Sequence, residues 1–71
     1  MKDRVQHAIR NRLTEGFSGT PAQWQAELLR AGHEFEYQSV WQSLRALQLK
    51  GEIRAEKVSH ITLYGPLNGA R

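Results

Sequence analysis

The sequence lacks the residues on which many small proteins depend for stability or chemistry. None of its 71 residues is cysteine, which excludes disulfides and thiolate chemistry. The three histidines, His7, His33 and His60, do not have the spacing of metal ligands. Asp3 is the one aspartate and stands near a terminus, so it is a poor orienting residue for a Ser-His-Asp set. We therefore expect no enzymatic activity, no metal and no cofactor.

Long apolar runs are also missing. The chain has no stretch of about 18 apolar residues, and its start, Met1–Arg4, leads into a mixed polar segment, which predicts neither a membrane span nor a secretory signal. We expect a cytoplasmic protein without a membrane partner. Because 71 residues leave no room for a ligand-sensing domain, we expect no small-molecule ligand and control by abundance or by a partner.

Positive charge is in mild excess and is placed unevenly. Ten Lys or Arg face seven Asp or Glu, for a net charge of +3. Residues 1–19 carry four cations and two carboxylates, 20–36 one and three, 37–51 two and none, and 52–71 three and two. An acidic segment therefore separates basic ones, and this distribution favours a polyanionic partner more than the total charge does.

Apolar residues at helical spacing predict three helices. Val5, Ile9 and Leu13 recur every four residues, with Ala8 beside them, and predict a helix over 3–13.

A second helix is predicted from its start signal. Residues 20–23, Thr-Pro-Ala-Gln, form a capping box with proline at the first helical position. Trp24, Leu28 and Leu29 are expected to point inward, and Gly32 marks the end.

The third helix, between Glu36 and Lys50, has two faces. Val40, Leu44 and Leu47 occupy one narrow arc, and the polar residues Gln38, Gln42 and Arg45 lie roughly opposite.

After Gly51 the apolar period changes to two, which predicts a hairpin with one buried face. Ile53 and Ala55 are expected on that face, and Ile61 and Leu63 with them. The expected turn is 57–59, Lys-Val-Ser, and residues 65–71 are expected to form a flexible tail.

Three helices followed by a hairpin resemble the winged helix-turn-helix family, in particular the heads of GntR-type and MarR-type repressors. The residues that carry the resemblance end the turn, bury the third helix and open the wing: Phe35, Val40, Leu44, Leu47, Gly51 and Ile53. The resemblance implies an α+β winged helix-turn-helix domain over residues 1–64, with the hairpin as its wing.

The resemblance also implies a function. The third helix would lie in the major groove of double-stranded DNA and the wing would touch the backbone. The residues expected to contact DNA are Tyr37, Gln38, Ser39, Gln42, Arg45, Lys50, Arg54 and Lys57. Further phosphate contacts are expected from the first helix, at Lys2, Arg4, Arg10 and Arg12. We expect a nucleoid-associated transcriptional regulator of the size common among phage and plasmid proteins, acting as a homodimer.

Two features favour a different reading, in which the third helix and Trp41 dock another protein as an adaptor or inhibitor. Glu34 and Glu36 stand where the third helix begins and would repel phosphate, so either binding is weak or these residues face away from the backbone. Trp41 lies at the border between the two faces of the helix, where it fills the edge of the core or meets a partner. Leu49 points to the polar face, where a second protomer could cover it.

Overall fold

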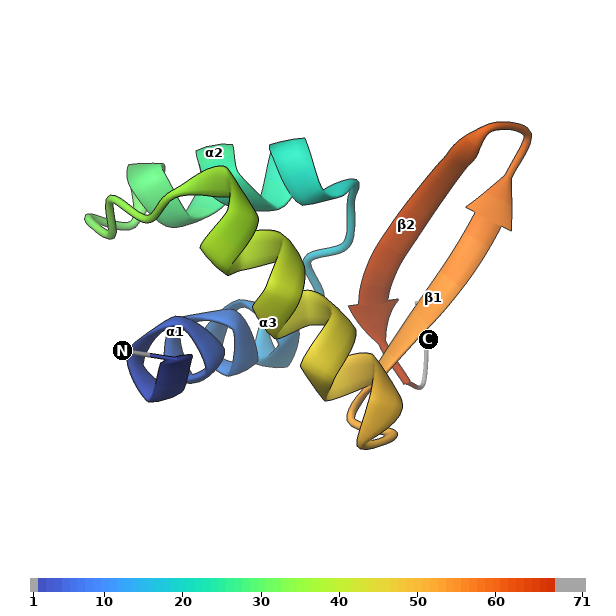
Figure 1. Cartoon of the computed structure of the whole chain (residues 1–71), viewed down its shortest axis with the longest axis horizontal. Helices are drawn as coiled ribbons and strands as arrows, with labels where there is room; N and C mark the ends of the chain where they lie inside the picture. Colours follow the sequence, from blue (N-terminus) through green and yellow to red (C-terminus); the bar gives the residue numbers. More distant parts are fainter. Residues whose placement is uncertain (1, 68–71) are drawn as a thin grey trace.

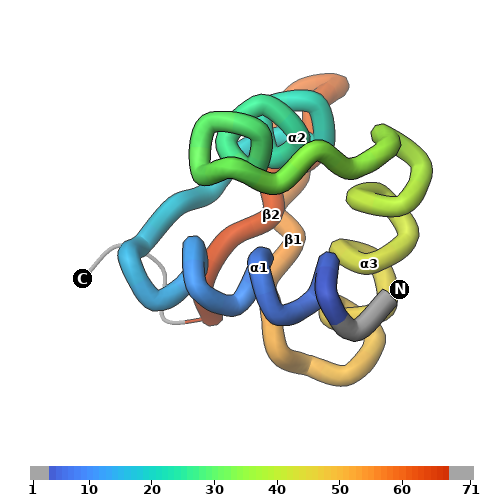
Figure 2. The backbone as a smooth tube through the Cα atoms, turned by 90° about the vertical axis from the view of Figure 1, so that its left-hand side faces the viewer, coloured from blue at the N-terminus to red at the C-terminus, as the bar shows by residue number. Residues whose placement is uncertain are grey.

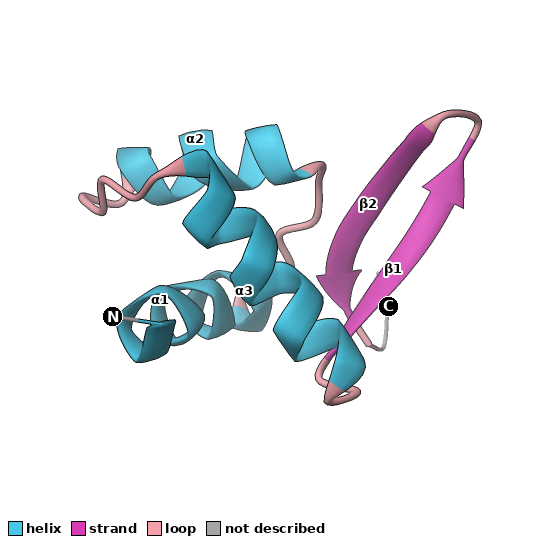
Figure 3. Ribbon diagram, in the orientation of Figure 1, coloured by secondary structure: helices cyan, strands magenta, loops and turns pink. Residues whose placement is uncertain are grey.

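Three helices are followed by an antiparallel hairpin in the computed structural model, which describes the backbone of residues 2–67 and the side chains of residues 4–67. The elements are α1 (Lys2–Thr14), α2 (Pro21–Arg30), α3 (Tyr37–Leu49), β1 (Ile53–Val58) and β2 (Ile61–Pro66) (Figures 1 and 3). This arrangement confirms the predicted α+β class and is a winged-helix-like fold, with residues 53–66 as the wing. None of the described helices is long and apolar enough to cross a membrane.

Local sequence sets where the helices begin and end. The capping box of α2 is complete, since the Gln23 N–H donates to Thr20 Oγ1 (3.2 Å) and the Thr20 N–H donates to Gln23 Oε1 (2.9 Å). Each helix ends at a glycine in the left-handed region. At the end of α3 this is Gly51, with φ of +80°, and the next N–H, of Glu52, donates to the Leu47 carbonyl (2.9 Å).

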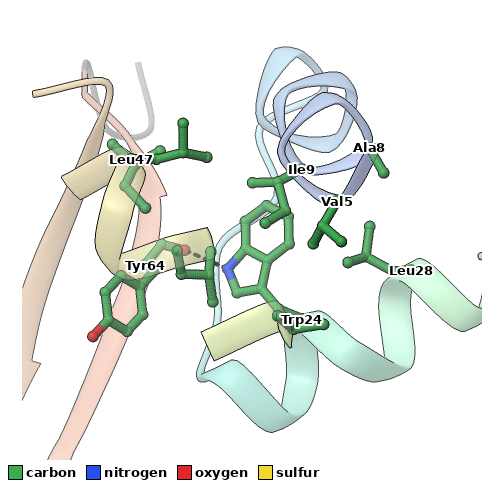
Figure 4. Close-up of a cluster of buried hydrophobic side chains, with 10 residues drawn as sticks. Val5, Ala8, Ile9, Trp24, Leu28, Leu47 and Tyr64 are labelled. Atoms are coloured by element: carbon green, nitrogen blue, oxygen red, sulfur yellow. Dashed lines mark hydrogen bonds between the residues drawn. The ribbon is translucent and has the colours of Figure 1, made fainter. Parts of the chain in front are cut away.

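The helices and the wing share one core (Figure 4). Its buried residues are Val5, Ala8, Ile9, Trp24, Leu28, Val40, Leu44, Leu47, Ile53 and Tyr64. Trp24 is fully buried, and its Nε1 donates to the Tyr64 carbonyl (2.8 Å), which ties α2 to β2. Phe17 packs edge-on against the Trp24 ring, with 4.7 Å between centroids. Figure 2 shows α1 and α2 one below the other, with α3 beside them and the hairpin behind.

Gly19 and Gly65 hold the base of the wing close to the helices. Gly19 forms an antiparallel bridge with Tyr64, donating to its carbonyl (3.1 Å) and accepting from its N–H (2.8 Å). A Cβ at Gly65 would lie 2.5 Å from Ser18 Cβ, far inside van der Waals contact. The segment before α2 therefore runs against β2 as a minimal third strand.

The predicted inward face of β2 is wrong. Tyr64 is buried opposite Ala55, whereas Ile61 is half exposed and pairs with Val58 near the tip. The turn consists of residues 59–60, Ser-His, rather than 57–59. This changes the pairing by an odd number of residues and exchanges the two faces of the strand. Ser59 has φ of +60° and the following residue does not have positive φ, as in a type II′ turn.

Two further expectations need correction. Leu29 is 57% exposed, because Trp24 and Leu28, four residues apart, already fill the inward arc of α2. The expected start of the tail at residue 65 also differs from the structure, since β2 continues to Pro66 through its pairing with Ile53. Of the expected tail, residues 68–71 lie outside the described residues.

Candidate nucleic-acid interface

α3 presents a polar outward face opposite its buried one. Gln38, Gln42 and Arg45 are exposed, as the helical periodicity predicts. Between Tyr37 and Leu49 there is no carboxylate, and Arg45 is the single charged residue. A glutamine amide both donates and accepts hydrogen bonds, and the arginine fork matches guanine edges or phosphate. The outward face of α3 therefore carries groups able to contact base edges without repelling phosphate.

The predicted contact residues of α3 do not all lie on one side. Tyr37 and Gln38 line a small hollow of about 200 Å³ together with Trp41. Ser39 and Gln42 line a different depression of about 430 Å³, here called the acidic groove. The acidic groove lies between the first turns of α1 and α3 and is lined by Arg4, Val5, Glu34, Phe35, Glu36, Ser39, Gln42 and Ser43. The structure therefore does not bring half-buried Ser39 onto the side of α3 that holds Tyr37.

The two acidic residues before α3 face the acidic groove. Glu34 and Glu36 also line a second groove, along the exposed side of α2 with Leu29, and they take no part in the hollows beside Trp41. Glu36 is the N-cap residue of α3, and its side chain makes no capping hydrogen bond. Both carboxylates therefore line grooves that do not include Trp41.

Trp41 lies outside the core. It is 38% exposed, so it does not complete the buried cluster as an edge residue does. The Arg45 guanidinium carbon lies 5.8 Å from the centroid of the Trp41 ring, within cation–π range. The two residues, four positions apart on α3, form one side-chain unit.

A second hollow, of about 330 Å³, separates Trp41 from the wing and is here called the wing hollow. Its lining comes from the start of α2, from α3 and from β2, as Thr20, Pro21, Trp41, His60, Ile61, Thr62 and Tyr64. The wing residues among these were not predicted, because a turn at 57–59 in place of 59–60 exchanges the faces of β2. A two-residue turn at 59–60 sets the correct pairing of the strands and therefore identifies which residues of β2 face the helices.

The two cations of the wing lie on opposite faces. Lys57 pairs with Thr62 and shares the face of Tyr64, which turns toward the helices. Arg54 is on the other face, where it lines a depression with Glu56 and Ser18. Arg54 and Lys57 therefore do not form one continuous basic stripe with α3.

Ion pairs within the fold engage the described cations of α1 and α2, apart from Arg4. Arg12 contacts Glu27 (3.2 Å), which Arg30 also contacts (3.3 Å), and Arg10 contacts Glu52 (2.8 Å). Arg10 and Arg12, expected to contact phosphate, are thus engaged within the fold. The side chain of Lys2, expected to do the same, lies outside the described residues.

The other predicted cations with described side chains form no ion pair; one of them, Arg4, is in α1, and the charge of Lys50 helps to lower the pKa of Glu52. Arg45, Lys50, Arg54 and Lys57 make no ion pair with any side chain in residues 4–67. Lys50 caps the end of α3 with its backbone N–H and is exposed. Arg45, Arg54 and Lys57 are exposed as well.

Glu52 has a perturbed pKa. The Arg10 guanidinium donates to both of its carboxylate oxygens (2.8 and 3.2 Å) and holds the pKa of Glu52 below its ordinary value of 4.5. Glu52 directly precedes β1, so this pair fastens α1 to the start of the wing.

Neither a metal cluster nor a relative identifies the chain. Within the part of the chain that the structure describes, no three His, Asp or Glu side chains are grouped to hold a metal ion. Comparison with family models, with curated proteins and with solved structures finds no match. The assignment of a winged-helix-like fold rests on the order of the helices and the wing.

Proposed function

We propose that this chain is a double-stranded DNA-binding protein that acts in transcription regulation and has no enzymatic activity. One observation carries the proposal: the described cations of α3 and the wing are free of ion pairs, whereas Arg12 and Arg30 of the first two helices are paired with Glu27. Because intramolecular pairs neutralise the described cations of α1 and α2 other than Arg4, most of the charge left for phosphate lies on α3 and the wing.

The proposed contacts follow from chemistry and position. Gln38 and Arg45, on the outward face of α3, would read base edges in the major groove, where glutamine pairs with adenine and arginine with guanine. Lys50 and Lys57 would bind phosphates on either side of the helix. Arg54 lies on the far face of the wing, so it would reach only a phosphate beyond the edge of the DNA major groove that α3 occupies. Gln42 would contact DNA from the side of the acidic groove.

The test is a titration with duplex DNA over a range of salt concentrations. If Lys50, Arg54 and Lys57 each neutralise about one phosphate, log affinity falls against log salt with a slope of about −2.7. Lys57→Ala should weaken binding for all sequences and reduce the steepness of the slope by about 0.9. Arg30→Ala is the matched control, because it removes an exposed cation paired on α2.

Two outcomes would contradict the proposal. The first is the absence of binding to any duplex at low salt. The second is a loss of affinity in Arg30→Ala as large as that in Lys57→Ala, since it would show that charge anywhere on the surface suffices. Replacing Gln38 and Arg45 together by alanine should abolish sequence preference in an unselected pool of duplexes and leave the weaker non-specific binding.

We also propose that the DNA-bound form is a homodimer on paired half-sites. Leu49 favours this, because it is 76% exposed and stands on the outward face near the end of α3. Sedimentation with and without duplex tests it, and a monomer under both conditions at high concentration would refute it. Leu49→Ala should lower the dimer fraction without unfolding the chain.

A second candidate function is protein docking through α3. The observation in its favour is the exposure of Tyr37 (48%) and Trp41 (38%) on neighbouring turns, since tyrosine, tryptophan and arginine are the residues that dominate protein interfaces. Salt separates the two functions. Binding that persists at high salt with little dependence on its concentration favours a protein interface, whereas a steep slope favours DNA.

A further inference from the structure

The two tryptophans, Trp24 and Trp41, differ in how deeply they are buried. Trp24 is fully buried and hydrogen-bonded, whereas Trp41 keeps 38% of its surface in solvent and is not part of the core. A tryptophan carries a large apolar face, and a small domain gains stability by burying such faces. The packing of the described residues therefore does not account for the position of Trp41.

The side chains beside Trp41 leave its ring open on two sides. Tyr37 and Arg45 lie one turn before and one turn after it on α3, with the Arg45 guanidinium 5.8 Å from the ring centroid. The Tyr37 hollow opens on one side and the wing hollow on the other, and Trp41 belongs to both. At about 330 Å³ the wing hollow is at the lower end of the range for small-ligand sites, a size suited to one flat ring system.

The charge around Trp41 suits a phosphodiester chain. The lining of the wing hollow includes two threonines, Thr20 and Thr62, and no acidic residue. Lys57, paired with Thr62, stands on the same face of the wing. The unpaired carboxylates Glu36 and Glu56 line other depressions, Glu36 the acidic groove and Glu56 the far face of the wing.

We infer that Trp41 is a stacking platform for one unpaired nucleic-acid base, which enters between α3 and the wing while the duplex lies along α3. The inference rests on the proposed function and adds to it a preference for duplexes that carry an unpaired nucleotide. In an intact duplex neighbouring pairs cover both faces of every base, so Trp41 has nothing to stack on. A bulged or unpaired nucleotide exposes its face, and stacking on an aromatic side chain contributes about 1–3 kcal/mol per base.

The experiment compares a short duplex with the same duplex carrying one unpaired nucleotide. The wild-type chain should bind the bulged duplex more tightly and lose Trp41 fluorescence on binding, while buried Trp24 stays unquenched. Trp41→Ala should weaken binding to the bulged duplex by about 5- to 150-fold and leave binding to the plain duplex unchanged. Trp41→Phe, which keeps an aromatic face, should retain most of the preference.

Leu29→Ala is the matched control, because it removes an exposed apolar side chain of α2 that lines neither hollow beside Trp41, and it should leave both affinities unchanged. Equal affinity of the wild type for the two duplexes, or equal weakening of both by Trp41→Ala, overturns the inference and leaves the proposed function standing. If neither duplex binds at low salt, both fall. Self-association that Trp41→Ala abolishes, with unchanged DNA affinities, overturns the inference in favour of a protein interface.

Discussion

The two ends of the wing are built differently. At its base Tyr64 is buried, its carbonyl accepts from Trp24 Nε1 and from the Gly19 N–H, and Gly65 passes against Ser18 with no room for a side chain. At its tip the last pair of the ladder, Val58 and Ile61, is half exposed. Figure 1 shows the tip standing away from the helices.

This difference indicates which part of the wing serves the fold and which part is available to a partner. The base shares the core with all three helices, so a change there acts on global stability. The tip contributes little buried apolar surface and is held by its own ladder and turn, so a change there should act locally. Residues of the tip can therefore vary in contact chemistry without unfolding the domain.

The sharpest way to break the base is to add one carbon atom at Gly65. A Cβ there would lie 2.5 Å from Ser18 Cβ, so Gly65→Ala forces β2 and the segment before α2 apart. We expect a loss of about 1–3 kcal/mol in the free energy of unfolding, measured by urea denaturation. Overpacking of this kind also strains the Gly19–Tyr64 bridge.

The control for Gly65→Ala is to remove the atom that it meets. Ser18→Gly alone should change stability little, since Ser18 is exposed, and Ser18→Gly in the Gly65→Ala chain should restore most of the loss. If the two changes are simply additive, close contact with Ser18 is not the reason that glycine stands at position 65.

The sequence predicts the helices of this molecule better than it predicts the wing. Apolar spacing and capping signals identify the three helices and the core residues Val40, Leu44 and Leu47, because helical periodicity extends over many residues. The wing has six residues in each strand, and its faces depend on one turn that carries no glycine or asparagine signal. The wrong turn placed Ile61 on the buried face of the wing, and the wing hollow was therefore not predicted.

For the interface, the sequence identifies residue types but not their sides. Helical angles place Gln38, Gln42 and Arg45 outward, yet they cannot show that Ser39 lines the acidic groove, because that follows from where α1 packs. The ion pairs of Arg12 with Glu27 and of Arg10 with Glu52 join residues far apart in the chain, and no local pattern predicts them.

A change at the tip should act in the opposite direction to Gly65→Ala and by less. Ser59 has φ of +60°, a conformation that disfavours residues with a Cβ, so Ser59→Gly relieves strain while adding some chain entropy to the unfolded state. We expect a gain of up to about 1 kcal/mol, seen mainly as slower amide hydrogen exchange in the wing. His60→Gly is the control. It should weaken the turn, because position 60 has no positive φ, and a gain there would mean that the turn is not of type II′.

The smallest expected effect lies at the base, where Arg10 holds Glu52, and it should depend on pH. The Glu52 pKa is lowered in the folded chain, so folding favours the carboxylate; the pair stabilises above the ordinary pKa of 4.5, and its contribution is lost as pH falls through the lowered value. Glu52→Gln should thus be less stable than the wild type at neutral pH and equally stable in acid.

Glu56→Gln, which breaks no ion pair among the described residues, should show no such convergence. Because both side chains of the Arg10–Glu52 pair are partly exposed, salt should shrink the difference. A difference that survives both acid and salt would mean that Glu52 supports the base through packing and not through charge.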